Sequence, residues 1–230
     1  MTDLKHLQQT LGYSFEDQEL LSRALSHASW AHEHDVESNE RLEFLGDAVL
    51  QLITTQRLYS AFVEADEGTL SRVRTRIVRR ETLAEWGQHL GLDEALRLGV
   101  GEESDGGRQR SKLLCDAMEA VIGAVYLDGG LKASEVVLAP LMRPLIEEAS
   151  SDVEAFGKSP VSALQEWTQR HFGAAPDYVE REPVGPAHAR VFTVEARIEG
   201  RLIGVGEGAS KSAARAQAAG VALAALRDQT

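Results

Sequence analysis

Three acidic residues with helical spacing begin an apolar segment of the chain. Glu40, Glu43 and Asp47 follow one another at intervals of three and four residues, so an α-helix would place all three carboxylates on one face. Like charges at this spacing repel each other by roughly 0.2–0.5 kcal/mol per pair. A solvated helix face is the simplest interpretation. A bound cation is the alternative, and it is favoured by the apolar neighbours, which are Leu42, Phe44, Leu45, Ala48, Val49 and Leu50.

Gly46 lies inside the same predicted helix, beside the acidic residues. Glycine in a helix interior costs about 1 kcal/mol relative to alanine. Its presence therefore predicts that a second backbone or a ligand approaches the helix closely at this point.

A second segment, residues 112–128, also carries acidic side chains in apolar surroundings. Its pattern is that of a helix that is apolar nearly all round, and such a helix is normally buried. Asp116 and Glu119 interrupt the pattern one turn apart, although unpaired buried carboxylates are very costly. Either cations neutralise these two carboxylates or they carry protons.

Carboxylates presented by two apolar helices form a ligand set for hard divalent ions. Oxygen donors favour Mg²⁺ or Mn²⁺ over zinc. A ferritin-like di-iron site would need Glu-x-x-His on its helices. The third residue after Glu43 is Gly46, and the third after Glu119 is Ile122, so the sequence excludes that site.

The elements that must position these residues are helices. No proline occurs before Pro140, and helix-compatible sequence runs from Leu4 to Leu138. We therefore expect an all-α N-terminal domain over residues 1–149, with a last helix over residues 131–148. The polar residues that follow predict a short linker, residues 150–157.

Residues 158–230 predict a small α+β domain of order α-β-β-β-α. Ser159 is a suitable N-cap, and Pro160 follows at the first helical position. Residues 191–198 alternate between apolar and polar side chains, with Glu195 on the outer face, as in a half-buried strand. A turn at Glu199 and Gly200 leads to a further strand over residues 202–205, and an alanine-rich helix is expected over residues 210–226.

The single cysteine and the hydropathy of the chain restrict its location. Cys115 has no intrachain partner for a disulfide, which indicates a reducing compartment. On an apolar helix it is expected to be a small core residue. The apolar runs are too short to span a membrane, and the first six residues lack the character of a secretory signal. We expect a cytoplasmic protein with no membrane contact.

Two of these segments together resemble the signature segments of ribonuclease III. They read NERLEFLGDAVL over residues 39–50 and LLCDAMEAVIGAVYLDGG over residues 113–130, and DEGTLSRVR over residues 66–74 lies between them. The resemblance covers nearly the whole chain. It implies a metal-dependent endoribonuclease that hydrolyses phosphodiester bonds in both strands of double-stranded RNA and leaves 5′-phosphate and 3′-hydroxyl ends. It also implies a role in processing ribosomal RNA and other structured transcripts.

The resemblance assigns roles to the acidic residues. It implies a two-metal site that uses Mg²⁺, with Mn²⁺ as a substitute, and in which Asp47 and Glu119 are catalytic. One ion would lower the pKa of the attacking water, and the other would stabilise the leaving 3′ oxygen. Glu40 and Glu67 resemble family residues that position RNA or water near the site. The implied metal ligands are Glu43, Asp47, Asp116 and Glu119.

The C-terminal segment resembles a double-stranded RNA-binding domain. The resemblance is carried by Gln165 and Gln169 in the first helix, by the turn that contains His188, and by Lys211 and Arg215 at the start of the last helix. Such basic residues suit phosphates across a groove, whereas glutamine and histidine reach 2′-hydroxyls. An ordinary exposed face would also explain the two glutamines. The family usually has two or three adjacent basic residues where this chain has Lys211-Ser212, which predicts weaker binding in the same mode.

The charge of the chain restricts how RNA is bound. The net charge is −12; residues 1–157 hold 15 basic and 28 acidic residues, and residues 158–230 hold nine and eight. RNA binding must therefore depend on local patches and on divalent ions. Arg72, Arg76, Arg79 and Arg80 are expected to form one basic helix face, which is either a phosphate track or an ordinary solvated surface.

The resemblance also implies the assembly. One active site cannot cut both strands, so the family works as a two-fold homodimer with one site per strand. Phe44 resembles the aromatic residue that inserts into the partner, although a core position fits its spacing equally well. Double-stranded RNA is the expected ligand, and no small-molecule cofactor is expected. A non-catalytic RNA-binding protein on the same scaffold would be expected to lack the acidic set, which is complete here.

Overall fold

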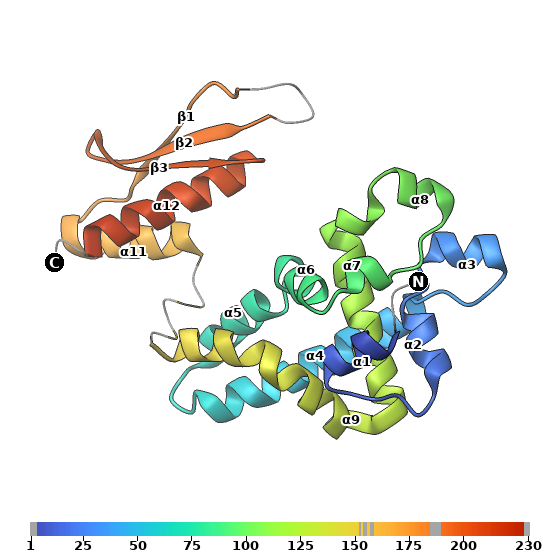
Figure 1. Ribbon diagram of the computed structural model, residues 1–230. Helices are drawn as coiled ribbons and strands as arrows, with labels where there is room; N and C mark the ends of the chain where they lie inside the picture. The colour runs from blue at the N-terminus through green and yellow to red at the C-terminus, as the bar shows by residue number, and fades with distance from the viewer. Residues whose placement is uncertain (1–3, 152, 154–155, 157–158, 185–189, 228–230) are drawn as a thin grey trace. The chain divides into compact units, whose positions relative to one another are not determined.

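The chain folds into two compact units, Met1–Val153 and Glu154–Thr230. The computed structural model describes residues 4–151, 153, 156, 159–184 and 190–227. The first unit is helical and the second combines helices with an antiparallel sheet (Figure 1), which confirms the predicted fold class.

The first unit is a set of helices packed around α4 and α9. Its core is formed by leucine, isoleucine, valine and methionine side chains, of which Leu50, Leu114 and Met118 are fully buried. Ten helical elements are described, with these bounds: α1 Leu4–Leu11, α2 Gln18–Ala24, α3 Ala28–His34, α4 Glu40–Ala61, α5 Glu67–Ile77, α6 Arg80–His89, α7 Leu92–Ala95, α8 Val100–Ser104, the short 3-10 helix η1 Gly107–Gln109, and α9 Ser111–Ser151.

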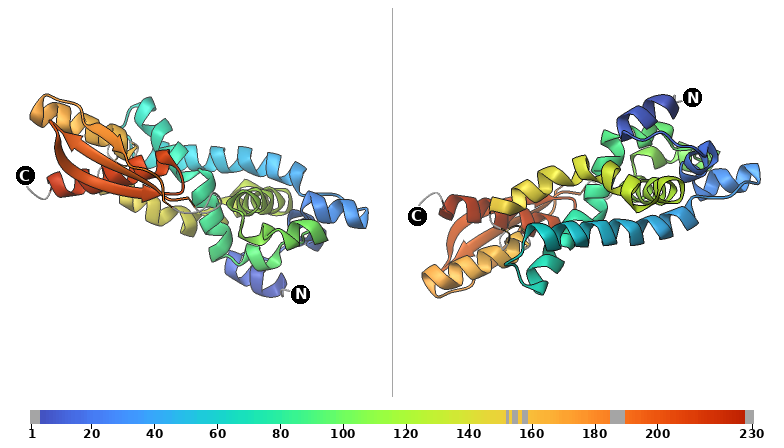
Figure 2. Two further views of the ribbon diagram at one scale, coloured as in Figure 1. Left: turned by 90° about the horizontal axis from the view of Figure 1, so that it is seen from above. Right: turned by 90° about the horizontal axis from the view of Figure 1, so that it is seen from below.

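Helix α9 consists of two segments joined at Gly130. Gly130 has φ 73° and ψ −174°, a conformation that lies outside the helical region and favours glycine. The first segment crosses α4 steeply, and the second turns back along α4 (Figures 1 and 2), where Arg57 donates a hydrogen bond of 3.4 Å to the carbonyl of Glu135. The helix continues to Ser151, beyond its expected end at Glu148.

The basic helix face predicted from Arg72, Arg76, Arg79 and Arg80 does not exist as one helix face, so that prediction was wrong. Helix α5 ends at Ile77, Arg79 is the N-cap of α6, and Arg80 is its first residue. The Thr82 hydroxyl donates a hydrogen bond of 3.2 Å to the carbonyl of Arg76, across the junction between the two helices. This contact closes the junction without glycine or proline, so the sequence carried no helix-stop signal there.

The second unit has the predicted order α-β-β-β-α. Its elements are α11 Pro160–Phe172, β1 Asp177–Glu180, β2 Phe192–Ile198, β3 Arg201–Gly208 and α12 Lys211–Arg227, and the antiparallel sheet has the order β1-β2-β3. The Ser159 hydroxyl accepts a hydrogen bond of 3.1 Å from the Ser162 amide and caps α11. Glu199 and Gly200 both have positive φ, as in the tight hairpin turns that join antiparallel strands.

Small residues bring α12 close to β3. A Cβ added to Gly206 would lie 2.1 Å from the amide nitrogen of Ala218, so only glycine fits at this position.

The predicted alternation of β2 is confirmed for its inner face, where Val194 and Ala196 are buried. Glu195 departs from the expected exposed position: it is only 8 % exposed, because the side chains of two arginines, Arg181 and Arg197, pair with its carboxylate.

Candidate metal centre and nucleic-acid interface

The centre is built where α4 and α9 touch backbone to backbone. A Cβ added to Gly46 would lie 1.7 Å from the carbonyl oxygen of Glu119, and one added to Gly123 would lie 2.2 Å from the carbonyl oxygen of Leu42. Any side chain at these positions would separate the helices. This contact confirms the prediction that another backbone approaches Gly46. It also brings the acidic residues of α4 and α9 to the same place.

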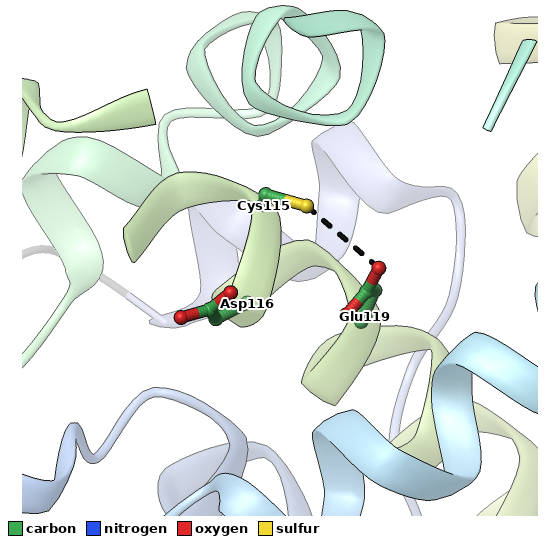
Figure 3. Close-up of side chains that lie close together, drawn as sticks. All are labelled: Cys115, Asp116 and Glu119. Atoms are coloured by element: carbon green, nitrogen blue, oxygen red, sulfur yellow. Dashed lines mark hydrogen bonds between the residues drawn. The ribbon is translucent and has the colours of Figure 1, made fainter. Parts of the chain in front are cut away.

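Helix α9 contributes two carboxylates and one thiol from a single turn. Ligand atoms of Cys115, Asp116 and Glu119 all lie within 4.8 Å of one another (Figure 3). Asp116 and Glu119 are half-buried, whereas Cys115 is only 7 % exposed. Both carboxylates therefore reach the surface of the unit from a helix whose remaining faces are buried, as the apolar pattern predicted.

Helix α4 contributes the facing carboxylates. Burial and, after it, the negative charges of Asp47, Glu43 and Asp116 together raise the pKa of Glu119 to about 7. Burial and the charge of Asp116 likewise raise the pKa of Glu43. The α4 carboxylates Glu43 and Asp47 therefore act on Glu119 across the helix contact. An arrangement of this kind is relieved by a bound cation or by a proton, which are the two alternatives that the sequence left open.

The donor set fits a hard divalent ion. The side chains of Glu43, Asp47, Asp116 and Glu119 carry oxygen donors, and oxygen donors suit Mg²⁺ or Mn²⁺ better than softer metals. The Cys115 thiol donates a hydrogen bond of 3.7 Å to a carboxylate oxygen of Glu119. Burial and the Glu119 charge raise the pKa of Cys115 to about 12, so the sulfur remains a protonated donor at neutral pH.

Two neighbours of the centre were not predicted from the sequence. The first is the Cys115 thiol, which was expected only to fill the core. The second is Lys112, whose ammonium nitrogen lies 2.5 Å from a carboxylate oxygen of Asp116. The spacing of four residues between Lys112 and Asp116 was the signal that could have indicated this pair.

The two acidic residues expected to assist the centre lie in different places. Glu40 is the first residue of α4; it accepts a hydrogen bond of 2.8 Å from the Ser38 hydroxyl, and its charge raises the pKa of Glu43. Glu67 is the first residue of α5 and accepts a hydrogen bond of 2.9 Å from Ser71. The charge of Glu40 thus acts on the acidic group, whereas Glu67 lies on α5, a different helix from the two that carry that group.

Phe44 points into solvent from α4. Phe44 is 82 % exposed, on a helix that has one buried and one exposed face. The interpretation of Phe44 as a core residue was therefore wrong. The Phe44 ring is therefore accessible to another protein.

The glutamines of the second unit are exposed on α11. Gln165 and Gln169 share one exposed face of α11 with Ser162, Glu166 and Arg170. Gln169 also donates a hydrogen bond of 3.2 Å to the carbonyl of Gly173, where the helix has ended. An exposed face of this kind is open to a ligand as large as an RNA duplex.

The basic residues of the second unit stand at the start of α12. Lys211 pairs with Glu180 of β1 at 2.5 Å. The guanidinium carbon of Arg215 lies 4.2 Å from the centre of the Tyr178 ring, in cation–π geometry. Both side chains are exposed, and both are held by residues of the neighbouring strand. His188 lies outside the described residues.

Comparison with known families identifies the first unit. Residues 17–145 match the family described as Ribonuclease-III-like. The chain belongs to the ribonuclease III family. Residues 160–226 of the second unit match the double-stranded RNA binding motif. The chain is thus a ribonuclease III-type endoribonuclease that carries a double-stranded RNA-binding domain.

Individual relatives support this membership over the full chain. Ribonuclease 3 of Pseudothermotoga lettingae is 43 % identical over 223 residues, which cover 94 % of this chain and 93 % of the relative. Ribonuclease 3 of Ralstonia pickettii is 45 % identical over 221 residues, which cover 96 % of this chain and 84 % of the relative.

Within the described parts of the chain, no helix combines the length and the apolar character needed to cross a bilayer.

A solved structure shares the fold of the first unit. The nuclease domain of ribonuclease III from Campylobacter jejuni superposes with a TM-score of 0.59 at 37 % identity, and the match covers 63 % of this chain and 96 % of that domain. A second structure of that Campylobacter domain describes structural flexibility in a region involved in its dimer formation.

Proposed function

We propose that the chain cleaves both strands of double-stranded RNA with divalent ions held by Glu43, Asp47, Asp116 and Glu119. The products would carry 5′-phosphate and 3′-hydroxyl ends, and ribosomal RNA and other structured transcripts would be the substrates. The observation that carries this proposal is the convergence of carboxylates from α4 and α9 at the Gly46 contact, where their charges raise the pKa of Glu119.

Mg²⁺ is the ion that the donor set suits best, with Mn²⁺ as a substitute. The carboxylates supply hard oxygen donors, and the protonated Cys115 thiol adds no anionic sulfur that would favour a softer metal. Bound divalent ions would supply an activated water and charge stabilisation at the leaving oxygen. Asp47 and Glu119 are the residues to which we assign the catalytic role.

The other groups around the centre are proposed to orient the reacting parts. The Cys115 thiol, as a hydrogen-bond donor, restricts the orientation of the Glu119 carboxylate. Glu40, whose negative charge raises the pKa of Glu43, would position RNA or water. Family resemblance assigns Glu67 the same role, which is to position RNA or water near the centre.

The second unit is proposed to hold the duplex by its shape. Exposed Gln165 and Gln169 would reach 2′-hydroxyls, whereas Lys211 and Arg215 would contact phosphates at the start of α12. Family resemblance assigns His188 a role in RNA binding as well. We propose residues 1–149 and 158–230 as the functional domains, with residues 150–157 as the linker.

Cleavage of both strands is proposed to require a homodimer. The exposed Phe44 side chain would insert into the partner, close to the centre because it adjoins Glu43. Two-fold symmetry would then place one centre on each strand. The single buried cysteine and the nature of the substrate are consistent with a cytoplasmic enzyme.

One assay tests the proposed function directly. The purified protein is incubated with a long RNA duplex in Mg²⁺, in Mn²⁺ and in EDTA, and single-stranded RNA of the same length is the control. We expect cleavage of the duplex in either metal, no cleavage in EDTA, and products that a 5′-phosphate-dependent exonuclease degrades. Cleavage that persists in EDTA would refute the metal assignment. A duplex that is bound but left uncut in both metals would indicate a non-catalytic RNA-binding protein.

A further inference from the structure

The Lys112 ammonium lies directly at the acidic centre. Its nitrogen is 2.5 Å from a carboxylate oxygen of Asp116. Asp116 is 14 % exposed, whereas the lysine side chain is 64 % exposed, so the lysine reaches the half-buried carboxylate from solvent. A lysine in this position neutralises the oxygen that a metal ion would use.

Lys112 also acts on the other helix. The positive charge of Lys112 lowers the pKa of Glu43 on α4, and the charges of Asp116 and Glu43 both raise the pKa of Lys112. Arg80, the first residue of α6, is the charged group that opposes the lysine, because its positive charge lowers the pKa of Lys112. One exposed ammonium therefore pairs with a carboxylate of α9 and acts electrostatically on a carboxylate of α4.

Helix stability alone does not explain this pair. An acid and a base four residues apart stabilise a helix best when the acid comes first in the chain. Here Lys112 precedes Asp116, which is the less favourable order. The lysine also stands at the start of α9, where the helix dipole disfavours positive charge. The carboxylate group is what makes the position favourable for a cation.

We propose that Lys112 competes with divalent cations for Asp116 and so raises the metal concentration at which the centre fills. The inference rests on the proposed metal-dependent function. A carboxylate oxygen that accepts a hydrogen bond from an ammonium group is a weaker ligand for a divalent ion, and the two positive charges repel each other. Because the lysine is flexible and largely exposed, the ion displaces it into solvent, and its removal changes metal affinity by a moderate factor.

Metal binding to the full-length protein without RNA tests this competition. Mn²⁺ is titrated into the wild type and into three variants, and binding is measured by electron paramagnetic resonance or calorimetry. The variants are Lys112→Gln, Lys112→Arg and Lys132→Gln. For Lys112→Gln, we expect the half-saturating Mn²⁺ concentration to fall by about twofold to fivefold. Lys112→Arg keeps the charge and should remain close to the wild type. Lys132→Gln removes a lysine from the same helix beyond Gly130 and should leave binding unchanged.

Thermal unfolding provides a second measurement. Without a divalent ion, Lys112→Gln should unfold at a lower temperature than the wild type, because the carboxylates lose their nearest cation. Saturating Mn²⁺ should remove this difference. Unchanged or weaker Mn²⁺ binding by Lys112→Gln would overturn the inference. So would a variant that binds Mn²⁺ normally but loses affinity for a duplex in Ca²⁺, because Lys112 would then be a phosphate contact.

Asp116→Asn separates this inference from the proposed function. If Asp116→Asn loses Mn²⁺ binding while Lys112→Gln binds Mn²⁺ like the wild type, the metal centre stands and the competition is wrong. If the wild type and Asp116→Asn bind Mn²⁺ equally, both the assignment of the metal centre and the competition by Lys112 are wrong.

Discussion

The α-carbon of Gly46 faces the carbonyl oxygen of Glu119 so closely that an added Cβ would lie 1.7 Å from that oxygen. This contact sets the separation of α4 and α9. Since Glu43 and Asp47 flank Gly46 in α4, and Glu119 itself belongs to α9, the same contact sets the spacing of the carboxylates. Replacement of a single hydrogen atom should therefore affect both the fold and the chemistry.

Gly46→Ala should destabilise the protein by about 2–4 kcal/mol, because the methyl group overlaps with backbone that cannot move without separating the helices. Urea unfolding followed by circular dichroism measures the loss. Gly101→Ala in α8 is the matched control, since an added Cβ there meets nothing within 4 Å. Equal stability of the two variants would show that the helix contact is not rigid.

Glu119→Ala should abolish RNA cleavage and leave duplex binding in Ca²⁺ nearly intact. The reason is that Glu119 is proposed to hold the reacting ions, whereas RNA affinity depends mainly on the second unit. Single-turnover cleavage and a binding titration of the same variant measure the two effects. Unchanged cleavage would refute the metal assignment.

Glu119→Gln should stabilise the protein at alkaline pH when a chelator is present. The folded-state pKa of Glu119 is raised from 4.5 to about 7, mainly by burial. The folded protein thus binds more protons than the unfolded chain between these values, so the wild type loses stability as the pH rises from 4.5 to 7. After a discount for partial exposure, the gain at pH 8 should be on the order of 1 kcal/mol, and it should vanish below pH 4.5. Urea unfolding at several pH values measures it, and a pH-independent difference would contradict the cause given.

Phe44→Ala should shift the protein from dimer to monomer with little change in the stability of each subunit. The Phe44 side chain is 82 % exposed, so its removal deletes few contacts within the chain. Sedimentation at several concentrations measures the dissociation constant. Val221→Ala, which also removes an exposed apolar side chain, is the control and should leave the dimer intact. A dimer unaffected by Phe44→Ala would exclude this residue from the interface.

Glu180→Gln should increase affinity for an RNA duplex, because it releases the Lys211 ammonium from its ion pair. We expect a gain of about twofold to fivefold at low salt, consistent with an exposed pair. Lys211→Gln should do the opposite and reduce the slope of log affinity against log salt by about 0.9. Fluorescence anisotropy over a salt series measures both. If Glu180→Gln weakens binding, Lys211 does not contact phosphate.

Removal of residues 154–230 should weaken duplex binding at physiological salt and leave some cleavage at low salt and high Mg²⁺. The truncation follows the boundary between the two compact units and keeps α9 complete to Ser151. Most of the excess negative charge would remain in the truncated protein, so its binding should be strongly salt-sensitive. Equal activity of the truncated and full-length proteins at both salt concentrations would show that the second unit is not the RNA-binding unit.

The sequence by itself determined the patterns that arise between neighbouring residues. The spacing of Glu40, Glu43 and Asp47, the acidic interruption at Asp116 and Glu119, and the change from helical to alternating periodicity after residue 158 depend only on neighbours in the chain. These patterns were sufficient for the all-α unit and for the helices and last two strands of the second unit, whereas the position of β1 was not located. They also indicated that something approaches Gly46, although not that it is the Glu119 carbonyl.

Relations between distant segments were decided by the tertiary structure. Phe44 and Leu45 have equally apolar neighbours, and only the packing of α4 leaves Phe44 in solvent. The burial of Glu195 depends on arginines that pair with it, and the break between α5 and α6 depends on Thr82. Periodicity reports which face of an element is apolar, but not which partner covers it, because coverage is fixed by contacts across long stretches of chain.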